Sequence, residues 1–355
     1  MSCIPLLLQF TASLSLHPSY QETFGGMVLS LLQYCNVQHR NLSRCFENIE
    51  SKSKEQRVYR FLAKADIDQS EFARATISTF FKKNIKMHII FDRTNWKFGD
   101  TDINFLVLAV RIGHKTFPLF WSMLDHRGNS NTEQRIDLMN KFIEVFGTDR
   151  IETFTGDREF IGEEWIQFLC EKNINFCIRF RSNQLVPYGS HDEKPLKLFF
   201  DEAKDRTLYK DMYGKKLLFV GKKMPKDETR SEDEYLIVCS NIPRPNKVLD
   251  IYKTRWRIEM CFKDLKTAGF NLEETHMKKP ERLAKLMCVL TIAMILGLKA
   301  SVFKKPRSKK TVKCNELSYF NMGLRWIQDR IQELKKPMWE TLAVLFDLIL
   351  EPDKI

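Results

Sequence analysis

The stretch from residue 86 to residue 180 constrains the fold most, because its hydrophobic pattern switches between strand and helix periods in a fixed order. Three apolar, β-branched runs come first, then a helix, a strand, a helix and a last strand. These runs span residues 86–92, 103–112, 116–121, 130–147, 151–155, 161–172 and 175–180. Pro118 in the third run indicates an edge strand or a bulge, since proline cannot donate a ladder hydrogen bond. The order β-β-β-α-β-α-β predicts an α/β fold with a mixed sheet.

The first helix of this stretch has a signal at each end. Ser130 and Glu133 have the spacing of a capping box, and Gly147 follows the last apolar position. Both signals predict a helix over the intervening residues.

A meander of three strands followed by α/β alternation is the ribonuclease-H-like arrangement, with one acid on the first strand and a second at the end of the fourth. Asp92 and Asp157 occupy these two places. A lone aspartate after a strand is more often a turn or a cap, so it is their joint placement that favours a shared site. Glu159 is a candidate supporting partner, whereas Asp100 and Asp102 fall in a predicted loop and are expected to be solvated.

A third acid lies on a late predicted helix, in the pattern Tyr-x2-Arg-x3-Glu-x6-Lys formed by Tyr252, Arg255, Glu259 and Lys266. On one continuous helix these four residues fall within an arc of roughly 60°. An apolar stripe runs beside them and consists of Ile251, Ile258, Phe262 and Leu265. The pattern suits a half-buried helix whose polar edge faces a phosphate backbone, and it also suits an ordinary amphipathic helix with internal ion pairs. Trp256 is expected to pack in the core beside the site.

Asp92, Asp157 and Glu259 together predict a metal-dependent phosphodiester chemistry. Hard divalent cations such as Mg²⁺ prefer carboxylate oxygens. Two such ions can clamp the attacking and leaving oxygens of a phosphodiester, so that water or a DNA 3′-hydroxyl attacks and no nucleophilic side chain is needed.

The charge balance predicts a polyanionic partner. The 355-residue chain carries 57 Lys and Arg against 45 Asp and Glu, a net charge of +12. A surplus of this size favours binding to nucleic acid or an anionic surface, without distinguishing DNA from RNA or from a membrane.

Cysteine use and apolar runs bear on the compartment. The nine cysteines form no Cys-x-x-Cys pair and no pairing with histidine at zinc-ligand spacing, which is typical of reduced thiols in a cytosol. Residues 1–16 lack the basic start of a signal peptide. The apolar run over residues 286–298 is too short to span a bilayer and predicts a buried core helix.

Composition along the chain predicts five segments. Residues 1–83 are a helical DNA-binding region, although a generic helical bundle fits equally well. The others are a first core part, a β-rich insertion, a second core part with the Tyr-Arg-Glu-Lys helix, and a basic loop with a helical tail, over residues 84–182, 183–248, 249–303 and 304–355. The basic loop supplies Lys304, Lys305, Arg307, Lys309 and Lys310 as candidate phosphate contacts.

Four motifs resemble the bacterial cut-and-paste transposases of the insertion-sequence-four family, over about residues 40–300. They are Phe91-Asp92-Arg93-Thr94, Gly128-Asn129-Ser130, Gly156-Asp157-Arg158-Glu159 and the Tyr-Arg-Glu-Lys pattern. The resemblance implies a DDE transposase whose catalytic triad is Asp92, Asp157 and Glu259.

The resemblance also implies roles in DNA binding. Tyr252, Arg255 and Lys266 match residues that contact phosphates near the cleaved end, and Arg158 is expected to bind DNA beside Asp157. Tyr235 matches an aromatic on the last insertion strand that receives a flipped base, although a partly buried strand tyrosine is an equal alternative.

The resemblance further implies Mg²⁺ as cofactor, with two ions bound and Mn²⁺ able to substitute. The implied partner is double-stranded DNA, both the terminal inverted repeats and the target, bound by a homodimer in the bacterial cytoplasm at the nucleoid and away from membranes. The implied steps are nicking, hairpin formation, hairpin opening and strand transfer. Two alternatives are a catalytically silent DNA-binding regulator and a host nuclease or resolvase. The intact acids argue against the regulator, and the large insertion argues against the nuclease.

Overall fold

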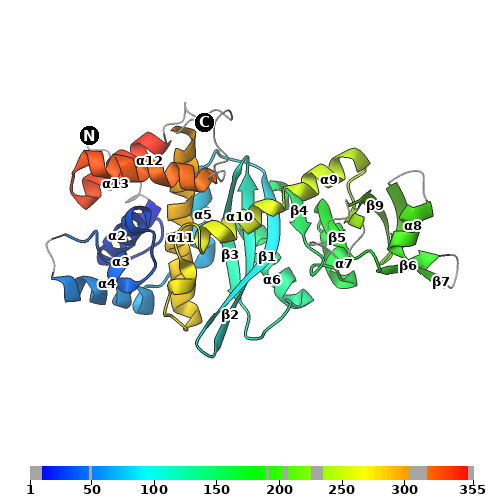
Figure 1. Cartoon of the computed structure of the whole chain (residues 1–355), viewed down its shortest axis with the longest axis horizontal. Helices are drawn as coiled ribbons and strands as arrows, with labels where there is room; N and C mark the ends of the chain where they lie inside the picture. The colour runs from blue at the N-terminus through cyan, green and yellow to red at the C-terminus, as the bar shows by residue number, and fades with distance from the viewer. Residues whose placement is uncertain are drawn as a thin grey trace.

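The centre of the molecule is an eight-stranded mixed sheet in the order β3-β2-β1-β4-β5-β10-β9-β8 (Figure 1). The computed structural model describes residues 10–47, 50–188, 192–202, 207–224, 235–303 and 318–350. The core strands are β1 Met87–Phe98, β2 Thr101–Ile112, β3 Lys115–Met123, β4 Ile151–Gly156 and β5 Phe176–Phe180. β1 pairs antiparallel with β2 and parallel with β4, and β4 pairs parallel with β5. The mixed ribonuclease-H-like sheet predicted from the sequence is therefore confirmed.

The connecting elements follow the predicted order. They are α6 Thr132–Phe146, the short 3-10 helix η1 Thr148–Arg150 and α7 Glu163–Glu171. β3 is an edge strand, and the ladder shifts by one residue where Pro118 pairs with Ala109, as the proline predicted.

The predicted capping box lies one residue too early. Asn131, not Ser130, caps α6, because its side chain accepts from the Gln134 backbone N–H while the Gln134 side chain accepts from the Asn131 backbone. At the other end Gly147 caps the helix with a positive φ of 80°, a conformation that glycine adopts without strain.

The strands of residues 183–248 mostly extend the central sheet. They are β6 Leu185–Tyr188, β7 Asp192–Pro195, β8 Thr207–Met212, β9 Lys215–Lys223 and β10 Tyr235–Ser240, with α8 Leu196–Glu202 among them. β10 pairs with β5 and carries β9 and β8 onto the same sheet, whereas β6 and β7 form a separate hairpin. The boundaries of the five predicted segments stay a prediction.

The N-terminal and C-terminal helices lie together at the end of the molecule away from β8 and β9 (Figure 1). The N-terminal ones are α2 Pro18–Tyr34, α3 His39–Leu42, α4 Ser51–Lys64 and α5 Gln69–Phe80. The C-terminal ones are α11 Pro280–Ala300, which continues into the 3-10 helix η3 Ser301–Phe303, then α12 Tyr319–Leu334 and α13 Met338–Leu350. Both helical regions were predicted.

α11 is the central helix between these helices and the sheet. Together with η3 it is long and apolar enough to cross a membrane, and no other helix in the described part of the chain is; 89% of its most apolar window is buried inside the protein. It packs against α2, α4 and α12 on one side and β3 on the other. It is the buried core helix that the sequence predicted.

α11 and α12 approach each other closely at two glycines. A Cβ added to Gly323 of α12 would stand only 1.8 Å from the carbonyl oxygen of Gly297 in α11. Only glycine at position 323 permits this approach, so the contact fixes α12 over α11.

The Tyr-Arg-Glu-Lys segment forms two helices, not the single one predicted. α9 Pro245–Lys253 packs against β5, β9 and β10, and α10 Trp256–Leu265 packs against β1 and β3. Between them the backbone N–H of Arg255 donates to the Tyr252 carbonyl at 2.9 Å, and that of Ile258 donates to the Arg255 carbonyl at 3.0 Å. These three-residue turns interrupt the α-helix, so the arc expected for one continuous helix does not describe the four signature residues.

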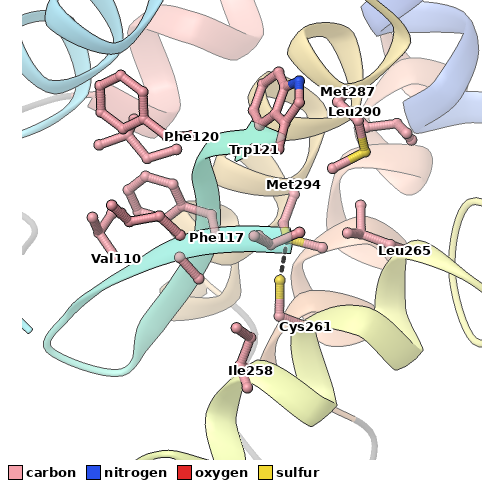
Figure 2. Packing of buried hydrophobic residues seen from close by; sticks show 14 of the residues in the cluster. Val110, Phe117, Phe120, Trp121, Ile258, Cys261, Leu265, Met287, Leu290 and Met294 are labelled. Atoms are coloured by element: carbon pink, nitrogen blue, oxygen red, sulfur yellow. Dashed lines mark hydrogen bonds between the residues drawn. The ribbon is translucent and has the colours of Figure 1, made fainter. Parts of the chain in front are cut away.

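The apolar face of α10 anchors this helix to the core. Ile258, Cys261 and Leu265 are buried on the side of α10 that faces β3 and α11, and the Cys261 thiol lies 3.5 Å from the sulfur of Met294 (Figure 2). Burial of side chains of this size contributes about 1.5–3 kcal/mol each. Because this face is held, the opposite face of α10 has a defined position over the sheet.

Candidate active site

The register of β1 and β4 places Asp92 beside Asp157. Ile90 of β1 pairs with Thr155 of β4 in parallel, so the positions two residues further along each chain are neighbours. Asp92 is still within β1, whereas Asp157 directly follows β4. The two aspartates that the sequence singled out therefore meet at one edge of the sheet.

A backbone N–H group holds one oxygen of each carboxylate. Arg93 N–H donates to Asp92 Oδ1 and Glu159 N–H donates to Asp157 Oδ1, each at 2.8 Å. These bonds fix the rotation of both side chains and leave the second oxygen of each carboxylate to other partners.

Arg255 links the third acid to this pair. Its Nη1 lies 3.4 Å from Asp92 Oδ2, and its Nη2 forms a close ion pair with Glu259 Oε1. Glu259 is in the first turn of α10 and Arg255 directly precedes that helix. The structure thus places Asp157 beside Asp92, and the Arg255 guanidinium links Asp92 to Glu259.

The environment of Asp92 disfavours its charge. Burial raises the pKa of this carboxyl from 3.8 to about 6, and Asp157 and Glu159 contribute in the same direction. Arg255 and the Arg93 N–H act the other way without cancelling the effect. Arg255 in turn has a raised pKa, because Tyr252, Asp92 and Glu259 outweigh its burial.

We expect Asp92→Asn to stabilise the metal-free protein. Since the folded pKa lies above the unfolded one, the wild type keeps its full stability below pH 3.8 and loses it as the pH rises through about 6. The loss amounts to about 3 kcal/mol at most. Urea unfolding in EDTA at pH 7.5 should therefore show Asp92→Asn more stable by roughly 1–3 kcal/mol.

The exposed Asp125→Asn is the matched control and should leave the unfolding free energy unchanged. A less stable Asp92→Asn would mean that attraction to Arg255 outweighs the desolvation of Asp92.

Tyr252 and Lys266 are engaged within the protein. The Tyr252 ring is buried among residues of β5, β9, β10 and α9, and the guanidinium carbon of Arg255 lies 5.9 Å from the ring centre. Lys266 Nζ pairs with Glu273 of the 3-10 helix η2 Leu272–Glu274 at 2.9 Å and donates to the Asn95 carbonyl at 2.9 Å. Tyr252 thus borders the acidic site through Arg255, and phosphate contact by either residue stays a prediction.

Trp256 differs from expectation, whereas Tyr235 fits the alternative of a buried strand tyrosine. Trp256 was predicted to pack in the core, but it is 60% exposed at the start of α10, next to Arg255. Tyr235 is only 7% exposed, and its hydroxyl donates to Asp201 Oδ1 at 2.6 Å. In this structure Trp256, not Tyr235, presents an open aromatic face.

The remaining predicted contacts divide into two groups. Arg158 is exposed beside Asp157. The basic-loop residues Lys304, Lys305, Arg307, Lys309 and Lys310 lie outside the described residues. Asp100 is exposed in a turn as expected, whereas Asp102 lies in β2 and not in a loop, and it pairs closely with Arg127.

One ion pair near the site was predicted only in part, since the sequence pattern assigned a supporting role to Glu159 and none to Arg93. Arg93 follows Asp92 by one residue, Glu159 follows Asp157 by two, and their side chains form an ion pair. The sequence did contain a signal for this ion pair, because Arg93 and Glu159, which carry opposite charges, closely follow Asp92 and Asp157, the two acids predicted to be neighbours.

The donor set fits a hard divalent cation in its chemistry. Asp92, Asp157 and Glu259 offer only carboxylate oxygens, and Mg²⁺ needs few such ligands besides water and substrate phosphate. In the described ranges, no three acidic, histidine or cysteine side chains converge closely enough to hold an ion. Asp92 and Asp157 would hold the ion, and Glu259 would join them after separating from Arg255.

A mixed sheet of this order, with acids on its first strand, after its fourth strand and on a late helix, defines a phosphoryl-transfer enzyme of the ribonuclease-H-like class. The family model of the transposase DDE domain matches residues 83–296, more than half of the chain, and the chain belongs to this family. No curated protein matches the chain. Membership implies DNA transposition and DNA binding, and such enzymes generally use divalent metal ions.

Proposed function

We propose that this protein is a cut-and-paste transposase of the insertion-sequence-four type. It binds the terminal inverted repeats of its element, nicks each end, forms and opens a hairpin, and joins the element to target DNA. The carrying observation is that Arg255 contacts both Asp92 of β1 and Glu259 of α10, while the register of β1 and β4 places Asp157 beside Asp92.

The catalytic role falls to the three acids. Asp92 and Asp157 would hold Mg²⁺, with Mn²⁺ able to substitute and a second ion shared with Glu259. The ions would supply charge stabilisation for an in-line displacement at phosphorus. The backbone caps on Asp92 Oδ1 and Asp157 Oδ1 leave the other oxygens for this task.

Arg255 couples DNA binding to the assembly of this site. Its charge offsets two carboxylates in the free protein, and among the described residues it is the only ion-pair partner of Glu259. A DNA phosphate is a strong competing partner, because guanidinium and phosphate form bidentate charge-assisted hydrogen bonds. When Arg255 turns to the phosphate, Glu259 becomes available beside Asp92 and Asp157.

The exposed side of the site would carry the DNA. Arg158 and Trp256 are exposed beside Asp157 and Arg255. Lys266 would contact a phosphate after leaving Glu273, and Tyr252 would act mainly by holding Arg255. The net charge of +12 supports binding of a long polyanion. Assembly as a homodimer on two element ends, in the bacterial cytoplasm, completes the proposal.

Hairpin formation requires a distorted DNA end, and an aromatic side chain can hold an unstacked base. Trp256 has the exposure for this, while Tyr235 is buried and bonded to Asp201. We expect Trp256→Ala to reduce hairpin formation about 10-fold or more, with nicking less affected, since base stacking contributes about 1–3 kcal/mol.

Tyr235→Phe is the comparison variant, since it keeps the buried ring and loses the hydroxyl that donates to Asp201. It should leave the ratio of hairpins to nicks unchanged. A hairpin yield in Trp256→Ala equal to that of the wild type would refute the stacking role of Trp256.

The deciding experiment incubates the protein with a DNA fragment that carries the element's own ends, with Mg²⁺ or Mn²⁺. Nicks, hairpins and strand-transfer products, separated on denaturing gels, are the expected result. Nicks without hairpins would exclude the insertion-sequence-four mechanism. Binding without any cleavage would favour the silent regulator.

A further inference from the structure

Arg93 and Glu159 form a partly buried ion pair next to Asp92 and Asp157. Arg93 Nε lies 2.8 Å from both carboxylate oxygens of Glu159, and the two side chains are 19% and 13% exposed. A pair this sheltered is screened much less by salt than a surface pair. It joins the chain after Asp92 to the chain after Asp157.

The same two residues hold the aspartates through their backbones. The Arg93 N–H is the donor to Asp92 Oδ1, and the Glu159 N–H is the donor to Asp157 Oδ1. Arg93 and Glu159 therefore each make two contacts. The backbone N–H of each residue bonds to one aspartate, and the two side chains bond to each other. A change in the ion pair would move both backbone donors and, with them, both carboxylates.

The loop between β3 and α6 holds this pair from a third direction. Arg93 Nη2 donates to Asn129 Oδ1 at 2.9 Å, and Ser130 Oγ lies 3.4 Å from Glu159 Oε1. Arg135 Nε in turn donates to Ser130 Oγ at 3.0 Å. The Gly128-Asn129-Ser130 motif thus has a structural explanation, since two of its side chains contact the pair.

Asn104 of β2 holds the loop itself. Its Nδ2 donates to the carbonyls of His126 and Gly128, at 2.9 and 3.2 Å, and its Oδ1 lies 3.4 Å from Arg93 Nη1. Asn104 of β2 therefore holds both Arg93 and the loop before α6 to the sheet. This gives the Arg93–Glu159 ion pair a rigid support.

We propose that Arg93 and Glu159 are positioning residues that set the spacing between the Asp92 and Asp157 carboxylates, and thereby the affinity of the site for a divalent cation. The inference rests on the proposed function, because it takes these two aspartates as the ion's ligands. Residues that orient metal ligands typically change metal affinity or activity by about 10- to 100-fold when they are substituted.

A purely stabilising ion pair would behave differently. Its removal would lower the free energy of unfolding, but the fraction of protein that stays folded would bind the ion as the wild type does. Ion affinity, measured on folded protein without DNA, therefore separates the two roles.

The test uses Glu159→Gln, Arg93→Gln and the double variant, with Glu164→Gln as matched control. Glu164 is an exposed glutamate in the first turn of α7. Mn²⁺ binding to the full-length protein without DNA is followed by electron paramagnetic resonance of the free ion. Circular dichroism confirms that each variant is folded, and cleavage kinetics give kcat and KM for DNA separately.

We expect each single variant to weaken Mn²⁺ binding about 10-fold or more and to lower kcat with little change in KM for DNA. The double variant should bind Mn²⁺ no more weakly than the weaker-binding single variant, because both changes break the same Arg93–Glu159 ion pair. Glu164→Gln should match the wild type.

Folded single variants that bind Mn²⁺ like the wild type would overturn the positioning role, as would losses that multiply in the double variant. A wild type that neither binds Mn²⁺ nor cuts DNA would instead refute the proposed function. Wild-type cleavage combined with normal Mn²⁺ binding by Glu159→Gln would refute only the positioning role.

Discussion

Asp157→Asn is expected to abolish DNA nicking, with a fall of about 10³-fold or more, while DNA binding persists. The amide keeps the size of the side chain and can still accept the Glu159 N–H bond at Oδ1. It loses the negative charge and one strong oxygen donor for a divalent ion. Since the ion lowers the barrier by charge stabilisation worth several kcal/mol, its loss accounts for an effect of this size. Single-turnover nicking in Mg²⁺ and in Mn²⁺ is the measurement.

Asp125→Asn is the matched control, an exposed aspartate in the turn after β3 that should cut at the wild-type rate. Gel-shift titration of both variants should give wild-type DNA affinity. Nicking that survives in Asp157→Asn would mean that the ion is held by other carboxylates, with Glu159 the nearest alternative.

Arg255→Ala should combine two defects that a simple phosphate contact would not. Without DNA, Glu259 and Asp92 lose their shared cation, so we expect Mn²⁺ to bind more tightly than in the wild type. With DNA, we expect about a 10-fold weaker affinity and a salt dependence reduced by roughly one unit of slope. Cleavage should fall by about 10²-fold, because the substrate no longer organises the site.

Arg255→Lys and Arg257→Ala complete this experiment. Lysine keeps the charge but cannot contact two acids with one planar group, so it should show an intermediate effect. Arg257 is exposed on α10, and its guanidinium lies 5.9 Å from the Tyr319 ring, so its removal tests the general loss of a cation. Unchanged Mn²⁺ affinity in Arg255→Ala would contradict the exchange of Arg255 between Glu259 and DNA.

The strand order and the placement of the acids could be predicted because both follow from local patterns. Runs of β-branched residues gave β1 to β5, and Asp92 and Asp157 stood at the ends of two such runs. Because β1 and β4 are parallel neighbours in the sheet, Asp92 and Asp157 lie side by side although they are far apart in the sequence.

The details that decide function depended on tertiary contacts. The helix breaks at Thr254 and Arg255 because α9 packs on β5, β9 and β10, whereas α10 packs on β1 and β3. The spacing of apolar residues along the sequence does not reveal such a break. Trp256 looked like a core residue by type, yet the break turns it outward. The bridging position of Arg255 likewise requires Asp92, 163 positions away in the chain.

The packing of α12 on α11 limits which C-terminally truncated forms of this protein could be stable. α11 is apolar on nearly its whole circumference, and Gly323 allows α12 to lie directly on it. A copy that stopped after α11 would keep all three acids and the Tyr-Arg-Glu-Lys segment but would expose that apolar surface to water. Such a product would aggregate or be degraded before it could compete for DNA. Truncated inhibitors that arise by loss of the 3′ end of the reading frame are therefore disfavoured by the fold itself.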